Sequence, residues 1–229
     1  MRRLYLALVA LLIAVPAHAE PYKGVLFAGG TVSESSGGYA GGMISLPGAA
    51  LGRGLGVRVG TNGGEYKYDA SGTRIAAEYV GGELALVYQI SGGWGWANFS
   101  AGPRVSYLNL TPNDPGNKLQ GTKVDAGIQS DGAYNIEKWH ISWFGSYGIA
   151  NESYLAKLQL GYLVAERSGT RIGVEGGIQG DSVYTKGNLG AFVSTSLMKD
   201  VEIQIAAGAT EQAGRGARAY VTIGLSKLF

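Results

Sequence analysis

The last twelve residues of the chain constrain its fold more than any other segment. Between Arg218 and Phe229, apolar side chains alternate with polar or small ones, and the final residue is aromatic. Alternation of this kind gives an extended strand one apolar face and one polar face. It is typical of a β-barrel whose outer face meets lipid. The apolar positions are Ala219, Val221, Ile223 and Leu225.

The first nineteen residues have the three parts of an export signal. Arg2 and Arg3 give it a positive start, and residues 4–15 form an apolar run too short to span a bilayer as a helix. Residues 17–19 read Ala-His-Ala, so we expect cleavage of this signal peptide (1–19) after Ala19. The mature chain would then be residues 20–229, one barrel domain exported to the bacterial outer membrane.

The composition excludes several classes of function. Residues 20–229 carry 17 Lys or Arg (the 19 of the whole chain minus Arg2 and Arg3) and 17 Asp or Glu, so no basic stripe indicates nucleic-acid binding. Without cysteine there is no disulfide and no thiolate site. His140 is the only histidine outside the signal, so we expect no metal and no cofactor.

Turn-forming clusters divide the remaining chain into twelve alternating segments. An even number suits a barrel with both chain ends in the periplasm, and segments of ten or more residues exceed the five or six typical of a soluble sandwich. The sequence therefore predicts an all-β fold, a single antiparallel transmembrane β-barrel of about 12 strands. The expected strands are residues 23–32, 38–47, 54–67, 74–91, 94–110, 121–134, 137–150, 153–165, 170–180, 186–197, 200–210 and 217–229.

The face of each strand that carries charged side chains should line the lumen, because a charge facing lipid at mid-membrane is costly. Mixed signs favour an interior in which most charges pair with one another, and a polar pore or ligand site is the alternative. The lumen candidates are Arg58, Glu83, Lys157, Arg171, Glu175, Glu202 and Arg218.

The segment 74–91 departs from regular alternation. Its apolar residues are odd-numbered from Ile75 to Tyr79 and even-numbered from Leu84 to Ile90. A β-bulge at residues 81–82, both glycine, would re-aim the side chains in this way. A strand that extends past the membrane is the other explanation.

His140-Ile141-Ser142 is the one motif that suggests catalysis. Some outer-membrane phospholipases and lipid A deacylases carry a His-x-Ser pair on one strand, where the imidazole can act as base for the serine. Here Trp139, Ile141 and Trp143 look lipid-facing, so His140 and Ser142 should face the lumen, away from acyl chains. We expect no catalytic residues and keep this pair as an alternative.

Residues 111–120 contain two prolines and a turn-forming core at 113–117, Asn-Asp-Pro-Gly-Asn. An outer loop of this composition suits recognition of an external partner. It suits a rigid cap equally well.

Several short motifs, taken in order, resemble the cellulose biosynthesis protein BcsS family of alphaproteobacterial type. The resemblance implies a small outer-membrane barrel associated with secretion of cellulose or a related exopolysaccharide, and it supplies no catalytic residues. The motifs are Gly-Val-Leu-Phe-Ala-Gly-Gly at 24–30, Leu-Thr-Pro-Asn-Asp-Pro-Gly-Asn at 110–117, Ser-Tyr at 146–147, Gly-Tyr at 161–162, Ile-Gly-Val-Glu at 172–175 and Gly-Ala-Phe-Val-Ser at 190–194.

The expected function is therefore a non-enzymatic outer-membrane barrel accessory to cellulose or exopolysaccharide biosynthesis or secretion. A general small porin or surface-loop adhesin is one alternative, and an acyl hydrolase using His140 and Ser142 is another. Expected partners are outer-membrane lipid, exopolysaccharide or secretion components, and the barrel-assembly machinery. That machinery reads C-terminal strands resembling this one at Thr222, Gly224 and Phe229, although Lys227 departs from the usual pattern.

Overall fold

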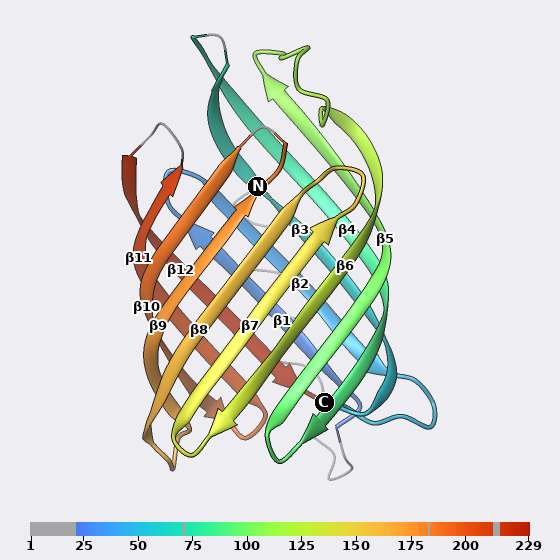
Figure 1. Cartoon of the computed structure of the whole chain (residues 1–229), viewed down its shortest axis with the longest axis vertical. Helices are drawn as coiled ribbons and strands as arrows, with labels where there is room; N and C mark the ends of the chain where they lie inside the picture. The colour runs from blue at the N-terminus through green and yellow to red at the C-terminus, as the bar shows by residue number, and fades with distance from the viewer. Residues whose placement is uncertain (1–21, 71, 183, 213–215) are drawn as a thin grey trace.

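A computed structural model describes residues 22–70, 72–182, 184–212 and 216–229 as one closed antiparallel barrel (Figure 1). The predicted fold class and the count of twelve strands are confirmed. The signal peptide and its cleavage site lie outside the described residues. The strands are β1 (Gly24–Val32), β2 (Ser36–Ser45), β3 (Gly54–Ala70), β4 (Thr73–Gly92), β5 (Gly95–Thr111), β6 (Gly121–Ile136), β7 (Trp139–Gly148), β8 (Tyr154–Ala165), β9 (Thr170–Gly180), β10 (Thr185–Met198), β11 (Val201–Gln212) and β12 (Gly216–Leu228).

The barrel closes where β1 pairs with β12, from Val25 opposite Leu228 to Val32 opposite Val221. Each described strand thus has a hydrogen-bonded neighbour on both sides, which leaves no open sheet edge among them. We call the end that holds Phe229 the C-terminal mouth and the opposite end the distal mouth. In Figure 1 the C-terminal mouth lies at the bottom.

The outer face carries a band of exposed apolar side chains, while polar side chains of the same strands point inward. On β9, Val174 is exposed and Glu175 is buried, and on β12 Ile223 is exposed and Tyr220 is buried. So much exposed apolar surface is stable against lipid, not water. No helix in the described ranges is long and apolar enough to cross a membrane.

The irregular alternation of residues 74–91 comes from a strand that extends beyond the apolar band. The β3–β4 register runs without a shift from Gly54 opposite Gln89 to Ala70 opposite Thr73, so the bulge explanation is wrong. Figure 1 shows the β3–β4 hairpin and the adjoining β5–β6 end rising above the other strands. We call this raised part the distal extension.

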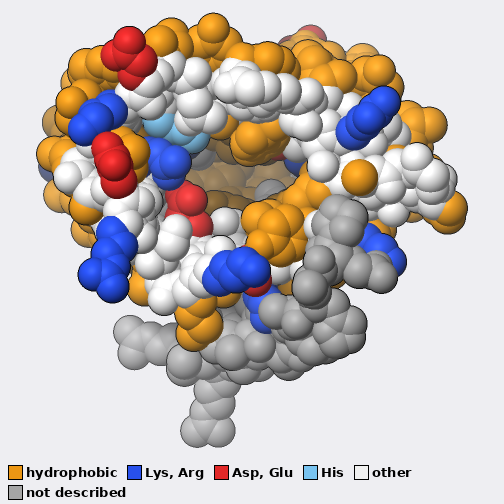
Figure 2. All heavy atoms as spheres, turned by 90° about the horizontal axis from the view of Figure 1, so that it is seen from below, with side chains coloured by type: hydrophobic (Ala, Val, Ile, Leu, Met, Phe, Trp, Pro, Cys, Tyr) orange, Lys and Arg blue, Asp and Glu red, His pale blue; other side chains and the backbone are white. Residues whose placement is uncertain are grey.

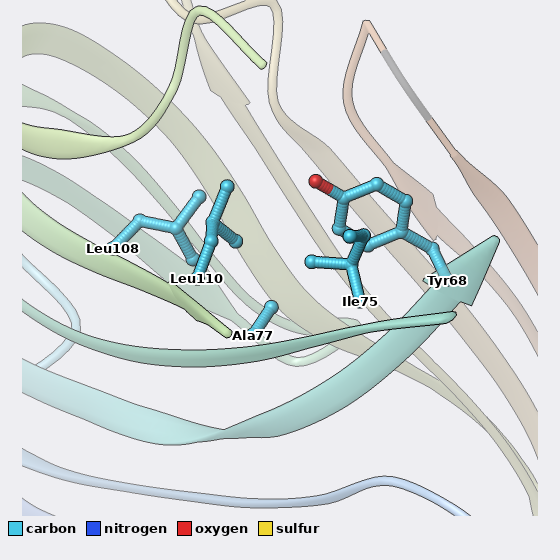
Figure 3. Packing of buried hydrophobic residues seen from close by; sticks show 5 residues of the cluster. All are labelled: Tyr68, Ile75, Ala77, Leu108 and Leu110. Atoms are coloured by element: carbon cyan, nitrogen blue, oxygen red, sulfur yellow. The ribbon is translucent and has the colours of Figure 1, made fainter. Parts of the chain in front are cut away.

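In the distal extension the two faces exchange their polarity. Its inner face carries a buried apolar cluster, and all five side chains point to the same side of the sheet (Figure 3). Its outer face carries Lys67, Asp69 and Glu78, all exposed. Beyond the bilayer the outer face meets water, so apolar side chains gain by turning inward. The cluster is Tyr68, Ile75, Ala77, Leu108 and Leu110.

The loop after β5 folds over this cluster as a cap. The Asn117 amide donates a hydrogen bond to the Tyr68 hydroxyl at 2.9 Å, and that hydroxyl donates to the Asp114 carboxylate at 2.7 Å. The side chain of Asn117 also accepts the backbone N–H of Leu119 at 2.9 Å. Of the two readings of residues 111–120, the structure favours the rigid cap.

Replacing Asn117 with alanine should release this cap. Asn117 is buried, and its loss leaves the Leu119 N–H without its acceptor and removes the donor to the Tyr68 hydroxyl, which keeps only Asp114, at a cost of about 1–3 kcal/mol. We expect trypsin to cleave the folded barrel faster after the exposed Lys118. Asn113→Ala, which removes only an exposed contact to Gln120, is the matched control. Equal cleavage rates in both variants would contradict the capping role.

Candidate binding site in the barrel lumen

The lumen encloses a cavity of about 640 Å³, which lies within the range of about 300–1,000 Å³ found for ligand pockets. From the C-terminal mouth the barrel is visibly hollowed at its centre (Figure 2). The inward-pointing charges around the cavity balance, with four basic and four acidic side chains. They are Arg58, Arg104, Lys157 and Lys186, and Glu83, Asp125, Asp131 and Glu175.

One hydrogen-bonded network covers the wall formed by β3 to β6. Arg58 donates to Gln129 at 2.7 Å and to Asp131 at 2.5 Å, and its Nε has no acceptor among the described residues. Gln129 in turn donates to Glu83 at 2.5 Å, and Arg104 donates to the same carboxylate at 3.1 Å. The four charged members of this network therefore compensate one another in two ion pairs, Arg58 with Asp131 and Arg104 with Glu83.

A second network on the other wall centres on Glu175, which is only 2% exposed. Its carboxylate accepts from Lys157 and Gln159 at 2.8 Å each and from Tyr220 at 2.7 Å. Tyr220 lies on β12 and reaches past β11 and β10 to β9. Gly190 makes this reach possible, because a Cβ there would lie 2.4 Å from the Tyr220 hydroxyl.

The predicted lumen residues lie at three different levels along the barrel axis. Arg58, Glu83, Lys157 and Glu175 line the central cavity as expected. Arg171 and Glu202 pair at 3.9 Å near the C-terminal mouth. Arg218 shares the inner face of β12 with Tyr220, but it lies above the central cavity at the distal mouth, where its side chain is 57% exposed and pairs with Glu34.

Sequence reasoning missed several cavity residues. Arg104 and Asp131 supply the charges that compensate Glu83 and Arg58. The rings of Phe27 and Tyr39 also line the cavity. No three His, Asp or Glu side chains in the described ranges come together as metal ligands would.

His140 and Ser142 point inward, but they take different partners. His140 Nδ1 lies 2.7 Å from Asn135 Oδ1, whereas the Ser142 hydroxyl donates to Gln159 at 3.0 Å. No hydrogen bond joins His140 to Ser142 in the described part of the barrel. The arrangement is that of polar residues lining the lumen.

The distal mouth is spanned by an aromatic contact. The rings of Tyr66 on β3 and Tyr184 before β10 stack at 5.1 Å with an interplanar angle of 27°. In the closed ring β3 and β9 lie opposite one another, so this contact crosses the opening. Beside it, the Lys186 ammonium donates to the Ser35 hydroxyl at 2.9 Å. These side chains narrow the passage from the cavity to the distal side.

Glu34, in the β1–β2 loop, clamps that loop to two hairpins. It accepts from Arg74 of β4 at 2.6 Å and from Arg218 of β12 at 3.4 Å. The hydrogen bond from Arg74 lowers the pKa of the Glu34 carboxyl below its usual value, and Arg218 acts in the same direction. The clamp is therefore an electrostatic contact between the β1–β2 loop and the distal ends of β4 and β12.

This clamp should open in acid. Since the pKa of Glu34 is lowered in the folded state, the contact is complete above its ordinary value of 4.5 and is lost as the pH falls through the lowered pKa. A nitroxide at Val32→Cys, unique in a chain without cysteine, should become mobile only in that acid range. With Glu34→Gln the label should be mobile at every pH. A transition that persists in Glu34→Gln would show that another group holds the loop.

A closed antiparallel barrel with a polar interior and an apolar outer band defines a transmembrane β-barrel of the outer-membrane type. Among solved structures, the COG4313 outer membrane channel from Pseudomonas putida F1 is similar over 94% of this chain and 100% of its own, with a TM-score of 0.52 and 12% identity. The family model for cellulose biosynthesis protein BcsS matches residues 25–229, and the chain belongs to that family.

Two further structures are similar at lower scores. The β domain of the Bordetella autotransporter BrkA has a TM-score of 0.49 and 14% identity, over 92% of this chain and 100% of that one. The KdgM porin in complex with disordered oligogalacturonate has a TM-score of 0.48 and 11% identity, over 90% and 99%. No curated protein matches the chain.

Proposed function

We propose that this barrel is a non-enzymatic outer-membrane component of cellulose or related exopolysaccharide secretion, with its C-terminal mouth facing the periplasm. Membership of the BcsS family supports the association with cellulose. The apolar outer band supports residence in a membrane. The separate partners of His140 and Ser142 favour this function over acyl hydrolysis.

The observation that carries the proposal is the constriction of the lumen. Tyr66 and Tyr184 meet across the distal mouth, and the central charges are paired within two networks on the wall. A general porin needs a continuous water-filled passage for small solutes. This lumen is better suited to holding a partner or ligand that arrives from the periplasm.

Planar-bilayer recordings test this point directly. The refolded mature chain should show little steady conductance, because the stacked tyrosines obstruct the distal mouth. Tyr184→Ala should raise the conductance, whereas Tyr147→Ala, at an exposed outward ring, should not. A steady porin-like conductance of the unaltered chain, unaffected by Tyr184→Ala, would favour the general porin.

The link to secretion is tested in cells. Deletion of the protein should reduce cellulose at the cell surface while glucan synthesis in isolated membranes continues. Complementation with Ser142→Ala should restore surface cellulose fully, because the serine has no catalytic part. Failure of that variant, with normal barrel levels, would favour the hydrolase.

A further inference from the structure

We propose that the central cavity binds a segment of a neutral β-linked glucan, with the ring of Tyr39 as the main stacking surface. This inference rests on the proposed function and specifies the ligand that the lumen holds. It assigns roles to Tyr39 and Phe27, two cavity residues on β2 and β1.

Tyr39 lies flat against a stretch of wall that has no side chains. A Cβ on Gly29 would sit 2.6 Å from the Tyr39 hydroxyl and 2.7 Å from its Cζ, and a Cβ on Gly224 would sit 3.6 Å from that hydroxyl. The two glycines are paired across β1 and β12. Tyr39 is nevertheless 47% exposed, so one face of the ring remains open to the cavity.

Phe27 and Arg58 continue this surface toward the C-terminal mouth. The Phe27 ring lies 6.4 Å from the Tyr39 ring, centroid to centroid. The Arg58 guanidinium carbon stands 5.9 Å from the centre of Phe27, held in place by Asp131. An aromatic face with polar groups beside it fits a pyranose ring, which presents C–H groups on its faces and hydroxyls around its edge.

The balance of charges around the cavity favours a neutral glycan over a polyanionic one. Four basic and four acidic side chains point into the cavity, and the two central carboxylates, Glu83 and Glu175, already accept hydrogen bonds from Arg104 and Lys157. A polyanionic chain would meet as much repulsion as attraction here. Hydroxyl groups can donate to the carboxylates and accept from the basic groups without adding charge.

Titration calorimetry with cellohexaose tests the proposal on the refolded mature barrel. We expect saturable binding that weakens about tenfold in Tyr39→Ala, which corresponds to a loss of about 1.4 kcal/mol on removal of the stacking ring. Tyr39→Phe keeps the ring and should bind within about threefold of the unaltered chain. Tyr88→Ala, which removes an exposed outward ring, should leave binding unchanged.

Every variant is first checked for the heat-dependent gel shift of a closed barrel, and Tyr39→Phe keeps the test valid if Tyr39→Ala does not fold. The inference is overturned if cellohexaose does not bind, if Tyr39→Ala and Tyr88→Ala bind alike, or if oligogalacturonate binds more tightly than cellohexaose. Loss of surface cellulose on deletion, without cellohexaose binding, would leave the proposed function standing and remove only this ligand. Binding without any cellulose defect would remove the secretion function instead.

Discussion

Arginine in place of Leu84 should lower the free energy of unfolding by about 2–4 kcal/mol, whereas arginine in place of Glu78 should change it by less than about 0.5 kcal/mol. Both positions lie on the outer face of β4, six residues apart. Leu84 belongs to the apolar band, where a charge must leave water for hydrocarbon. Glu78 lies on the distal extension, opposite Glu65, so a positive charge there even removes a like-charge pair.

Reversible guanidinium unfolding in lipid vesicles measures both variants against the unaltered chain. Equal destabilisation at the two sites would mean that the bilayer covers the distal extension as well. No cost at Leu84 would mean that this part of the outer face is not in lipid. Either result would overturn the boundary inferred from the exchange of polarity on β4.

Glu175→Ala should lower the free energy of unfolding by about 3 kcal/mol, the lower end of the range for a broken buried ion pair. The variant leaves Lys157 without its counter-ion and removes the acceptor of Gln159 and Tyr220. The side chain of Lys157 is 30% exposed to the lumen, so water can solvate its unpaired ammonium group. We therefore expect a destabilisation at the lower end of the range for a broken buried ion pair.

The same unfolding experiment measures this effect. Glu202→Ala removes the looser, half-exposed pair with Arg171 and should cost less than about 1 kcal/mol. Combining Glu175→Ala with Lys157→Met should recover part of the loss, because no unpaired charge then remains in the lumen. If the double variant is as unstable as the single one, the ion pair is not the source of the effect.

The barrel itself could be predicted because lipid outside and water inside impose alternation on every strand. This rule placed Val174 outward and Glu175 inward from the sequence alone. The alternation pattern suggested a bulge only between Tyr79 and Leu84. There the apolar side chains change from the inner to the outer face, because the distal extension has water on its outer face. A single strand cannot distinguish this reversal from a bulge, whereas the register with β3 does.

Alternation along the strands could predict only some residues of the candidate site. Charges on clearly alternating strands, such as Lys157 and Glu175, could be assigned to the lumen. Tyr39 and Phe27 could not be assigned to the lumen, because β1 and β2 are glycine-rich and have no charged residue that would show which face points inward. Contacts such as Tyr66 with Tyr184 join opposite sides of the ring, and no local pattern encodes them.

The exchange of polarity on β4 also fixes the depth at which the barrel sits. Adjacent outward positions lie about 7 Å apart along a strand, given a rise of about 3.4 Å per residue. Sinking by one such step would carry Glu78 toward hydrocarbon, and rising by one would lift Val80 into water. The chain thus holds its vertical position against displacement in both directions, and the distal mouth stays at a set height above the lipid.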